Sequence, residues 1–150
     1  MKDMFKWPFA IAAVLVVTRI VTEQMGMPDT VNNLISVAAL YVLIAPMYFA
    51  LKIAKSNEPH PYKNLLKTVA LFTVLVRGLL VIPTYWMAYG FNWTALRFSV
   101  AGGGIVGPDV SMAFVIGYPF VALAFWVAAS VLVGGGVGSA IIANTRRAAL

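Results

Sequence analysis

The sequence predicts an all-α integral membrane protein, a bundle of four transmembrane helices in a single domain covering residues 1–150. Of these residues, 61% are hydrophobic and only 11% are charged, and the mean hydropathy is +0.88. A soluble domain carries about 25% charged residues and is about half apolar. We therefore do not expect a water-soluble enzyme or a disordered chain. About 20 apolar residues cross the hydrocarbon core as a helix, so the chain has room for four spans.

The first predicted span covers residues 7–27 and has to carry charge. Its uncharged part, residues 7–18, is twelve residues long. As a helix this part is about 18 Å long, too short for about 30 Å of hydrocarbon. The pattern therefore predicts that Arg19 and Glu23 lie in the membrane or at its interface.

The second and third predicted spans are longer apolar runs joined by a basic, proline-containing turn. Residues 31–51 carry no charge, and Pro46 predicts a kink within them. The third span covers residues 67–89 and places Arg77 near its centre. Tyrosine and tryptophan residues crowd its far end, which is typical of an interfacial aromatic belt.

The connection between the third and fourth spans is rich in glycine, including a run at residues 102–104. It lacks the Gly-Lys-Ser/Thr pattern of a nucleotide-binding loop. We expect a turning external loop or a re-entrant segment here. Within it, Arg97 and Asp109 are candidates for the mouth of a polar cavity above Arg77.

The fourth span has two candidate starting points, because residues 110–145 lack charge over 36 positions. As one helix they would be about 54 Å long, more than one membrane. Pro119 suits a helix start, so we predict the span at residues 119–143 and a re-entrant or interfacial segment at residues 110–118. The alternative is a helix that starts with Asp109 as its N-cap and ends at the glycines from Gly134.

The basic residues predict the orientation. Eight of them fall at the N-terminus, between the second and third spans, or at the C-terminus, against two on the other side. Positively charged segments stay in the cytoplasm. We therefore expect a prokaryotic plasma (inner) membrane protein with both termini cytoplasmic. The eight residues are Lys2, Lys6, Lys52, Lys55, Lys63, Lys67, Arg146 and Arg147.

Arg19, Glu23 and Arg77 form the main candidate site, a cluster for a ligand or a partner. Counted from the cytoplasmic side, the two arginines lie at similar depths, and Glu23 is one helical turn beyond Arg19. A charge at the bilayer centre costs at least about 2.5–3.5 kcal/mol, so such residues usually pair and usually serve a function. We expect the first and third helices to be neighbours, with Glu23 near Arg77 or bridging Arg19 to it. One arginine would still lack a partner.

A second candidate is a seam of small residues spaced by four, formed by Ser130, Gly134 and Gly138. This spacing lets helix backbones approach closely, as in GxxxG pairs. The sequence leaves open whether the seam packs on the chain's own helices or docks to another protein.

The residue types in the chain argue against several classes of catalysis and of metal or cofactor binding. The chain has no cysteine and one histidine, His60, in a loop between two prolines. We identify no catalytic residues, no metal ligands and no cofactor site, and an enzyme is the weaker interpretation. We interpret the basic residues as determinants of membrane topology rather than as a surface that binds nucleic acid. A bound lipid is compatible with the buried charges.

Two functions remain. The first is an accessory or assembly subunit that contacts other membrane proteins, or copies of itself, through the seam and the buried cation. The alternative is a carrier or lipid-handling protein, working as a homodimer, that binds an anionic, phosphate-type headgroup through its arginines.

The charge asymmetry generates a topology prediction. Reporters fused at the C-terminus and within residues 101–107 should report opposite sides of the membrane, because the basic residues hold the C-terminus in the cytoplasm. The measurement is alkaline phosphatase and fluorescent-protein activity in intact bacteria. Both reporters active on one side would contradict the four-span arrangement.

Overall fold

The computed structural model describes residues 2–148 and is all-helical over them, apart from turns and one isolated bridge between Ser99 and Val106. Among these residues, four helices are long and apolar enough to cross a membrane. This confirms the all-α class and the four candidate spans. The helices cover Asp3–Gln24, Asp29–Ala54, Pro61–Gly90 and Met112–Arg147.

Three of the four spans are interrupted helices. The first is α1 (Lys2–Gln24) alone. The second contains α2 (Asp29–Leu34), α3 (Val37–Ala39), the π-helix η1 (Leu40–Ile44) and α4 (Ala45–Ala54). The third contains α5 (Pro61–Val76), the π-helix η2 (Arg77–Val81) and α6 (Ile82–Gly90). The fourth contains α7 (Met112–Ala129), the π-helix η5 (Ser130–Gly134) and α8 (Gly135–Arg147). Two short 3-10 turns, η3 (Leu96–Phe98) and η4 (Val100–Gly102), lie in the connection between α6 and α7.

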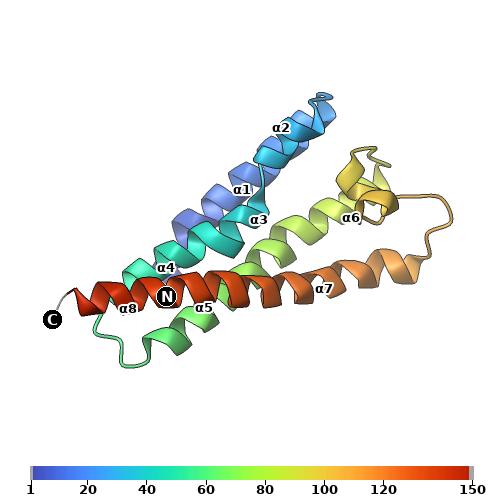
Figure 1. Cartoon of the computed structure of the whole chain (residues 1–150). Coiled ribbons are helices and arrows are strands. Elements are labelled where there is room, and N and C mark those ends of the chain that lie inside the picture. Colours follow the sequence, from blue (N-terminus) through green and yellow to red (C-terminus); the bar gives the residue numbers. More distant parts are fainter. Residues whose placement is uncertain (1, 149–150) are drawn as a thin grey trace.

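The four helices alternate in direction, so the basic segments of the chain lie at one end of the bundle (Figure 1). The start of α1, the turn between α4 and α5, and the end of α8 lie at one end of the bundle, here called the basic end (Figure 1). Arg146 ties the C-terminus to this turn by donating to the carbonyls of Ser56 (3.3 Å) and Glu58 (3.1 Å). The turn between α1 and α2 and the connection between α6 and α7 lie at the other end, here called the loop end. The side chain of Lys2 lies outside the described residues.

Two of the π-helical segments end two residues before a proline. Proline removes one backbone hydrogen bond, and its ring clashes with the carbonyl four residues earlier, so a wider turn relieves both problems. η1 precedes Pro46 and η2 precedes Pro83. The bend expected at Pro46 therefore takes the form of a π-helical turn, and Arg77 begins the corresponding turn of the third span.

The fourth helix begins earlier than predicted. α7 starts at Met112, and the side chain of Ser111 caps it by accepting from the amide of Phe114 (3.3 Å). The re-entrant segment predicted at residues 110–118 is therefore wrong, and so is Asp109 as the N-cap, since Asp109 sits in a turn with φ +58°.

Pro119 does not start the fourth helix; it lies inside α7. Its ring cannot donate to the carbonyl of Val115, which is left without its usual helical partner. The indole of Trp86 on α6 donates to this carbonyl instead (3.1 Å). A bond from a neighbouring helix thus allows a proline in mid-helix, a compensation that the sequence alone did not reveal.

The second helix contains a break that the sequence did not predict. α2 ends at Leu34, and Ser36 is extended (φ −106°, ψ 114°) before the helix resumes at Val37. Residues 37–54 then continue as one uninterrupted helical run. Irregular backbone at membrane depth is tolerated where it lines a cavity, and Ser36 is part of a cavity wall.

The small-residue seam lies inside the bundle. Ser130, Gly134 and Gly138 are all buried. A Cβ added at Gly134 would collide with the carbonyl oxygen of Val42 and would lie 2.5 Å from Cγ of Pro46. One at Gly138 would lie 2.7 Å from Leu65. The seam therefore brings the fourth helix into close contact with the second and third at the basic end.

The seam generates a stability prediction. Gly134→Ala should lower the free energy of unfolding by about 1–3 kcal/mol, because the added methyl group meets backbone that cannot move freely. Gly136→Ala is the matched control. Gly136 is exposed, a Cβ there meets nothing within 4 Å, and alanine is the better helix former. The measurement is thermal or denaturant unfolding in detergent. Equal effects of the two changes would contradict the close packing.

Candidate functional site

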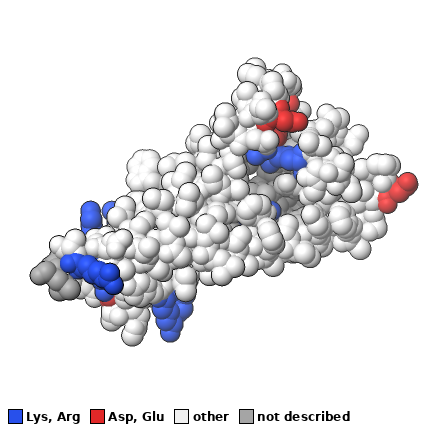
Figure 2. All heavy atoms as spheres, in the orientation of Figure 1, with Lys and Arg blue, Asp and Glu red and all other residues white. Residues whose placement is uncertain are grey.

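A cavity of about 320 Å³ lies between the loop-end halves of the helices. Figure 2 shows a hollow on this face of the molecule, with blue Lys or Arg atoms at its edge and within it. Its lining combines three arginines with four large aromatic rings and contains no carboxylate. The arginines are Arg19, Arg77 and Arg97, and the aromatic residues are Tyr41, Tyr85, Tyr118 and Trp126.

Arg77 is the most deeply placed charge, with only 7% of its surface exposed. Its Nη1 donates to the hydroxyl of Tyr41 (2.9 Å). The guanidinium also lies over two rings, 6.0 Å from the centroid of Tyr41 and 5.6 Å from that of Trp126. Each such cation–π contact contributes about 0.5–2 kcal/mol. The aromatic residues thus hold the charge in place without neutralising it.

The hydrogen-bonding capacity of Arg77 is largely unused. Arginine has five N–H donors and no acceptor. The Nε of Arg77 is buried without a hydrogen-bond partner, and no ion pair of Arg77 occurs within residues 2–148. A buried charge normally has a counter-charge, so this guanidinium is prepared for a partner that the described chain does not supply.

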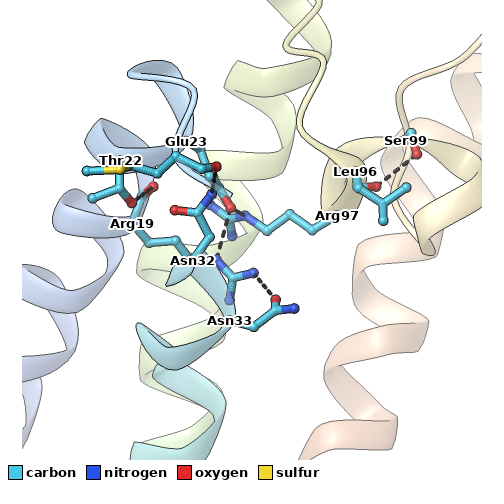
Figure 3. A network of polar contacts seen from close by, with 9 residues as sticks. Arg19, Thr22, Glu23, Asn32, Asn33, Leu96, Arg97 and Ser99 are labelled. Carbon is cyan, nitrogen blue, oxygen red and sulfur yellow. Dashed lines mark hydrogen bonds and ion pairs between the residues drawn. The ribbon is translucent and has the colours of Figure 1, made fainter. Parts of the chain in front are cut away.

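The carboxylate of Glu23 pairs with the other two arginines (Figure 3). Arg97 binds it with both Nε (2.7 Å) and Nη2 (2.9 Å), and Arg19 reaches it through Nε (2.9 Å). The carboxylate side chain is only 3% exposed, while those of Arg19 and Arg97 are 16% and 19% exposed. Asn33 on α2 accepts from the far end of Arg19 (3.0 Å). This network, here called the Glu23 clasp, links α1, α2 and the connection before α7.

Glu23 does not pair with Arg77 or bridge Arg19 to it. The first and third helices are neighbours as predicted, since α1 packs against α5 and η2, and Arg19 and Arg77 line the same cavity. Glu23 pairs with Arg97 instead, because the connection before α7 folds back over this end and delivers a bidentate guanidinium. No periodic pattern in the sequence predicts that the connection folds back in this way.

The connection is a small folded unit with its own apolar cluster, in which Phe98 and Val106 pack with Ala88 of α6. A Cβ at Gly104 would collide with the carbonyl group of Phe98, so this position of the glycine run is needed for close backbone approach. The guanidinium of Arg97 lies 4.1 Å from the ring centroid of Phe98. The unit therefore fixes Arg97 at the cavity. Asp109 is exposed in the turn before α7, and it is not among the residues that line the cavity.

The break in the second span also opens onto the cavity. Ser36, Val37 and Ala38 line it, and they begin the helical run of residues 37–54 without a side-chain cap. The first amides of a helix lack intrahelical partners and favour negative charge. Together with the arginines, the backbone here favours an anion.

Sequence reasoning identified the arginines but missed the aromatic lining and Ser36. Part of this was detectable, because Tyr118, Ala122 and Trp126 are spaced by four and share one face of a helix. The contribution of Tyr41 was not detectable, because it depends on the π-helical turns that set it against Arg77. No family model, no curated protein and no solved structure matches this chain. Interpretation of the site therefore depends on its geometry.

The clasp generates a coupling prediction. Glu23→Gln should lower the free energy of unfolding by about 3 kcal/mol, because it leaves two mostly buried guanidinium groups without a counter-charge. In double-mutant cycles measured by unfolding in detergent, Glu23 should couple to Arg97 by at least about 1 kcal/mol. Changes at Glu23 and Arg77 should add within about 0.5 kcal/mol, since they share no hydrogen bond.

The matched control is Asp3→Asn. Asp3 pairs with Lys6, and both side chains are largely exposed, so the change should have little effect. Strong coupling of Glu23 to Arg77, with none to Arg97, would contradict the clasp.

Proposed function

We propose that this chain is a membrane protein that binds an anionic, phosphate-type group in the arginine-lined cavity. In this proposal the four apolar helices cross a prokaryotic plasma membrane, and both termini are cytoplasmic. The loop end, with the cavity, then lies toward the outer face. Of the two functions that the sequence left open, this is the anion-binding one.

The observation that carries the proposal is the state of Arg77. It is buried, held by aromatic rings and one tyrosine hydroxyl, and has no carboxylate partner within residues 2–148. The cavity lining holds three guanidinium groups and no carboxylate, and the nearby carboxylate of Glu23 pairs with Arg19 and Arg97 rather than with Arg77. Charges at membrane depth are usually paired and usually functional. An exogenous anion supplies the missing counter-charge.

A phosphate-type group fits the donors best. The planar fork of a guanidinium matches the oxygens of phosphate in bidentate geometry, and these charge-assisted bonds are about twice as strong as neutral ones. Ser36 and the uncapped start of the helical run at Val37 add donors to the same cavity. Tyr41 accepts from Arg77, which leaves its hydroxyl proton for a ligand oxygen.

The accessory-subunit hypothesis ranks second. It was motivated by the small-residue seam and by an unneutralised cation. The structure buries Ser130, Gly134 and Gly138 against the chain's own helices, so the seam gives docking to another protein no specific support. The cation supports either hypothesis, and the cavity around it favours a small anionic group.

The test is ligand-induced stabilisation of the purified protein in a non-ionic detergent. Two phosphate monoesters are titrated, soluble glycerol phosphate and a short-chain phosphatidic acid, against sodium chloride of equal ionic strength. We expect a saturable rise in Tm with at least one of them, because a ligand that binds only the folded state stabilises it. Arg77→Gln should abolish the rise, since it removes the buried charge.

Arg146→Gln is the matched control. Arg146 is an arginine of the fourth span that binds backbone carbonyls at the basic end, away from the cavity, so the rise should persist. If neither monoester stabilises the protein, or if Arg77→Gln leaves the rise unchanged, the proposed function is wrong.

A further inference from the structure

The cavity opens on the side of the bundle. Its two walls come from helices that diverge toward the loop end (Figure 1). Ser36, Val37 and Ala38 line one wall, and Tyr118, Ala122 and Trp126 of α7 line the other. α2 and α3 pack on α1, whereas α7 packs on α5 and α6. We call this opening between α3 and α7 the side portal; the hollow in Figure 2 lies on this face.

The loop end of the cavity is covered, in contrast to the side portal. The folded connection lies over it, and Gly103 of this connection is part of the cavity wall. The Glu23 clasp ties the connection to α1 through the two bonds from Arg97. An anion arriving along the bundle axis therefore meets the ion pair between Arg97 and Glu23.

The surface outside the portal is apolar. Val121 and Phe125 are exposed on α7 next to the cavity-lining residues. These side chains belong to a span with a mean hydropathy of 2.1. In a membrane this side of the bundle faces acyl chains rather than water.

We infer that the ligand is an acidic phospholipid whose phosphate headgroup enters through the side portal and binds Arg77, while its acyl chains stay outside along α3 and α7. This inference rests on the proposed function and names the source of the anion. The cavity volume of about 320 Å³ is at the small end of ligand pockets. It accommodates a headgroup and leaves the chains on the apolar surface outside the portal.

The experiment compares lipid and soluble forms of the same headgroup and blocks the portal. The Kd values of short-chain phosphatidic acid and of glycerol phosphate are measured by calorimetry on the full chain in non-ionic detergent. We expect the lipid to bind at least about tenfold more tightly, because only the lipid gains acyl contacts outside the portal.

Ala122→Trp narrows the portal from α7 and should weaken lipid binding by at least about tenfold. Ala122 also lines the cavity, so glycerol phosphate should bind more weakly too, but by less than the lipid, because it needs no lateral path for acyl chains. The matched control is Ala124→Trp, on the exposed opposite face of α7, which should change neither ligand. Ala38→Trp narrows the portal from the other wall and replaces Ala122→Trp if that variant does not fold.

The outcomes separate the two proposals. If glycerol phosphate binds through Arg77 as tightly as the lipid, or if portal variants affect both ligands equally or neither, the side-entry inference is wrong and the proposed function stands. If neither ligand binds through Arg77, both are wrong. Native mass spectrometry adds an independent test: a retained phospholipid mass that disappears in Arg77→Gln supports the inference, whereas a lipid-free dimer that requires Arg77 overturns it.

Discussion

The burial of Arg77 without a carboxylate partner is the constraint on which the loop-end half of the structure depends. A guanidinium in an apolar bundle has to be solvated by something, and here that role falls to Tyr41 and Trp126 together with an open cavity. The charge begins the π-helical turn η2, and Tyr41 lies in the π-helical turn η1. Two widened turns, each set by a following proline, thus place a charge and its hydroxyl partner in contact from neighbouring helices.

The two kinds of cation at this end have different roles because their surroundings differ. Arg97 and Arg19 share one carboxylate and hold three chain segments together at the loop end. Arg77 holds nothing together by ion pairing and keeps its Nε free. Because Glu23 pairs with Arg97 and Arg19, the arginine at the base of the cavity is the one without a carboxylate partner.

Composition and local spacing in the sequence were enough to predict part of this arrangement. They predicted four apolar helices, the contact between the first and third helices, and the proximity of Arg19 and Glu23 at one helical turn. They did not predict the features that depend on neighbouring segments. Pro119 suggested a helix start, but an indole from α6 satisfies the carbonyl it leaves free. Arg97 was predicted at the mouth of the cavity, but its pairing with Glu23 depends on the folding of the connection and was not predicted.

The small-residue seam and the cavity are two consequences of one packing arrangement. Without a hydrophobic force between helices in lipid, close approach at small residues is what holds a bundle together. Gly134 and Gly138 allow that approach only toward the basic end, where the fourth helix meets α4 and α5 and Arg146 ties the C-terminus to the neighbouring turn. Toward the loop end, α7 carries the bulkier Tyr118 and Trp126 on the cavity wall. The helices are packed closely at the basic end and are separated by aromatic residues at the loop end. This arrangement leaves a wedge-shaped space, here called the wedge, between them. The buried arginine, the break in the second helix and the side portal all lie within that wedge, so the close packing at the glycines of the basic end and the open cavity at the loop end belong to one arrangement of the helices.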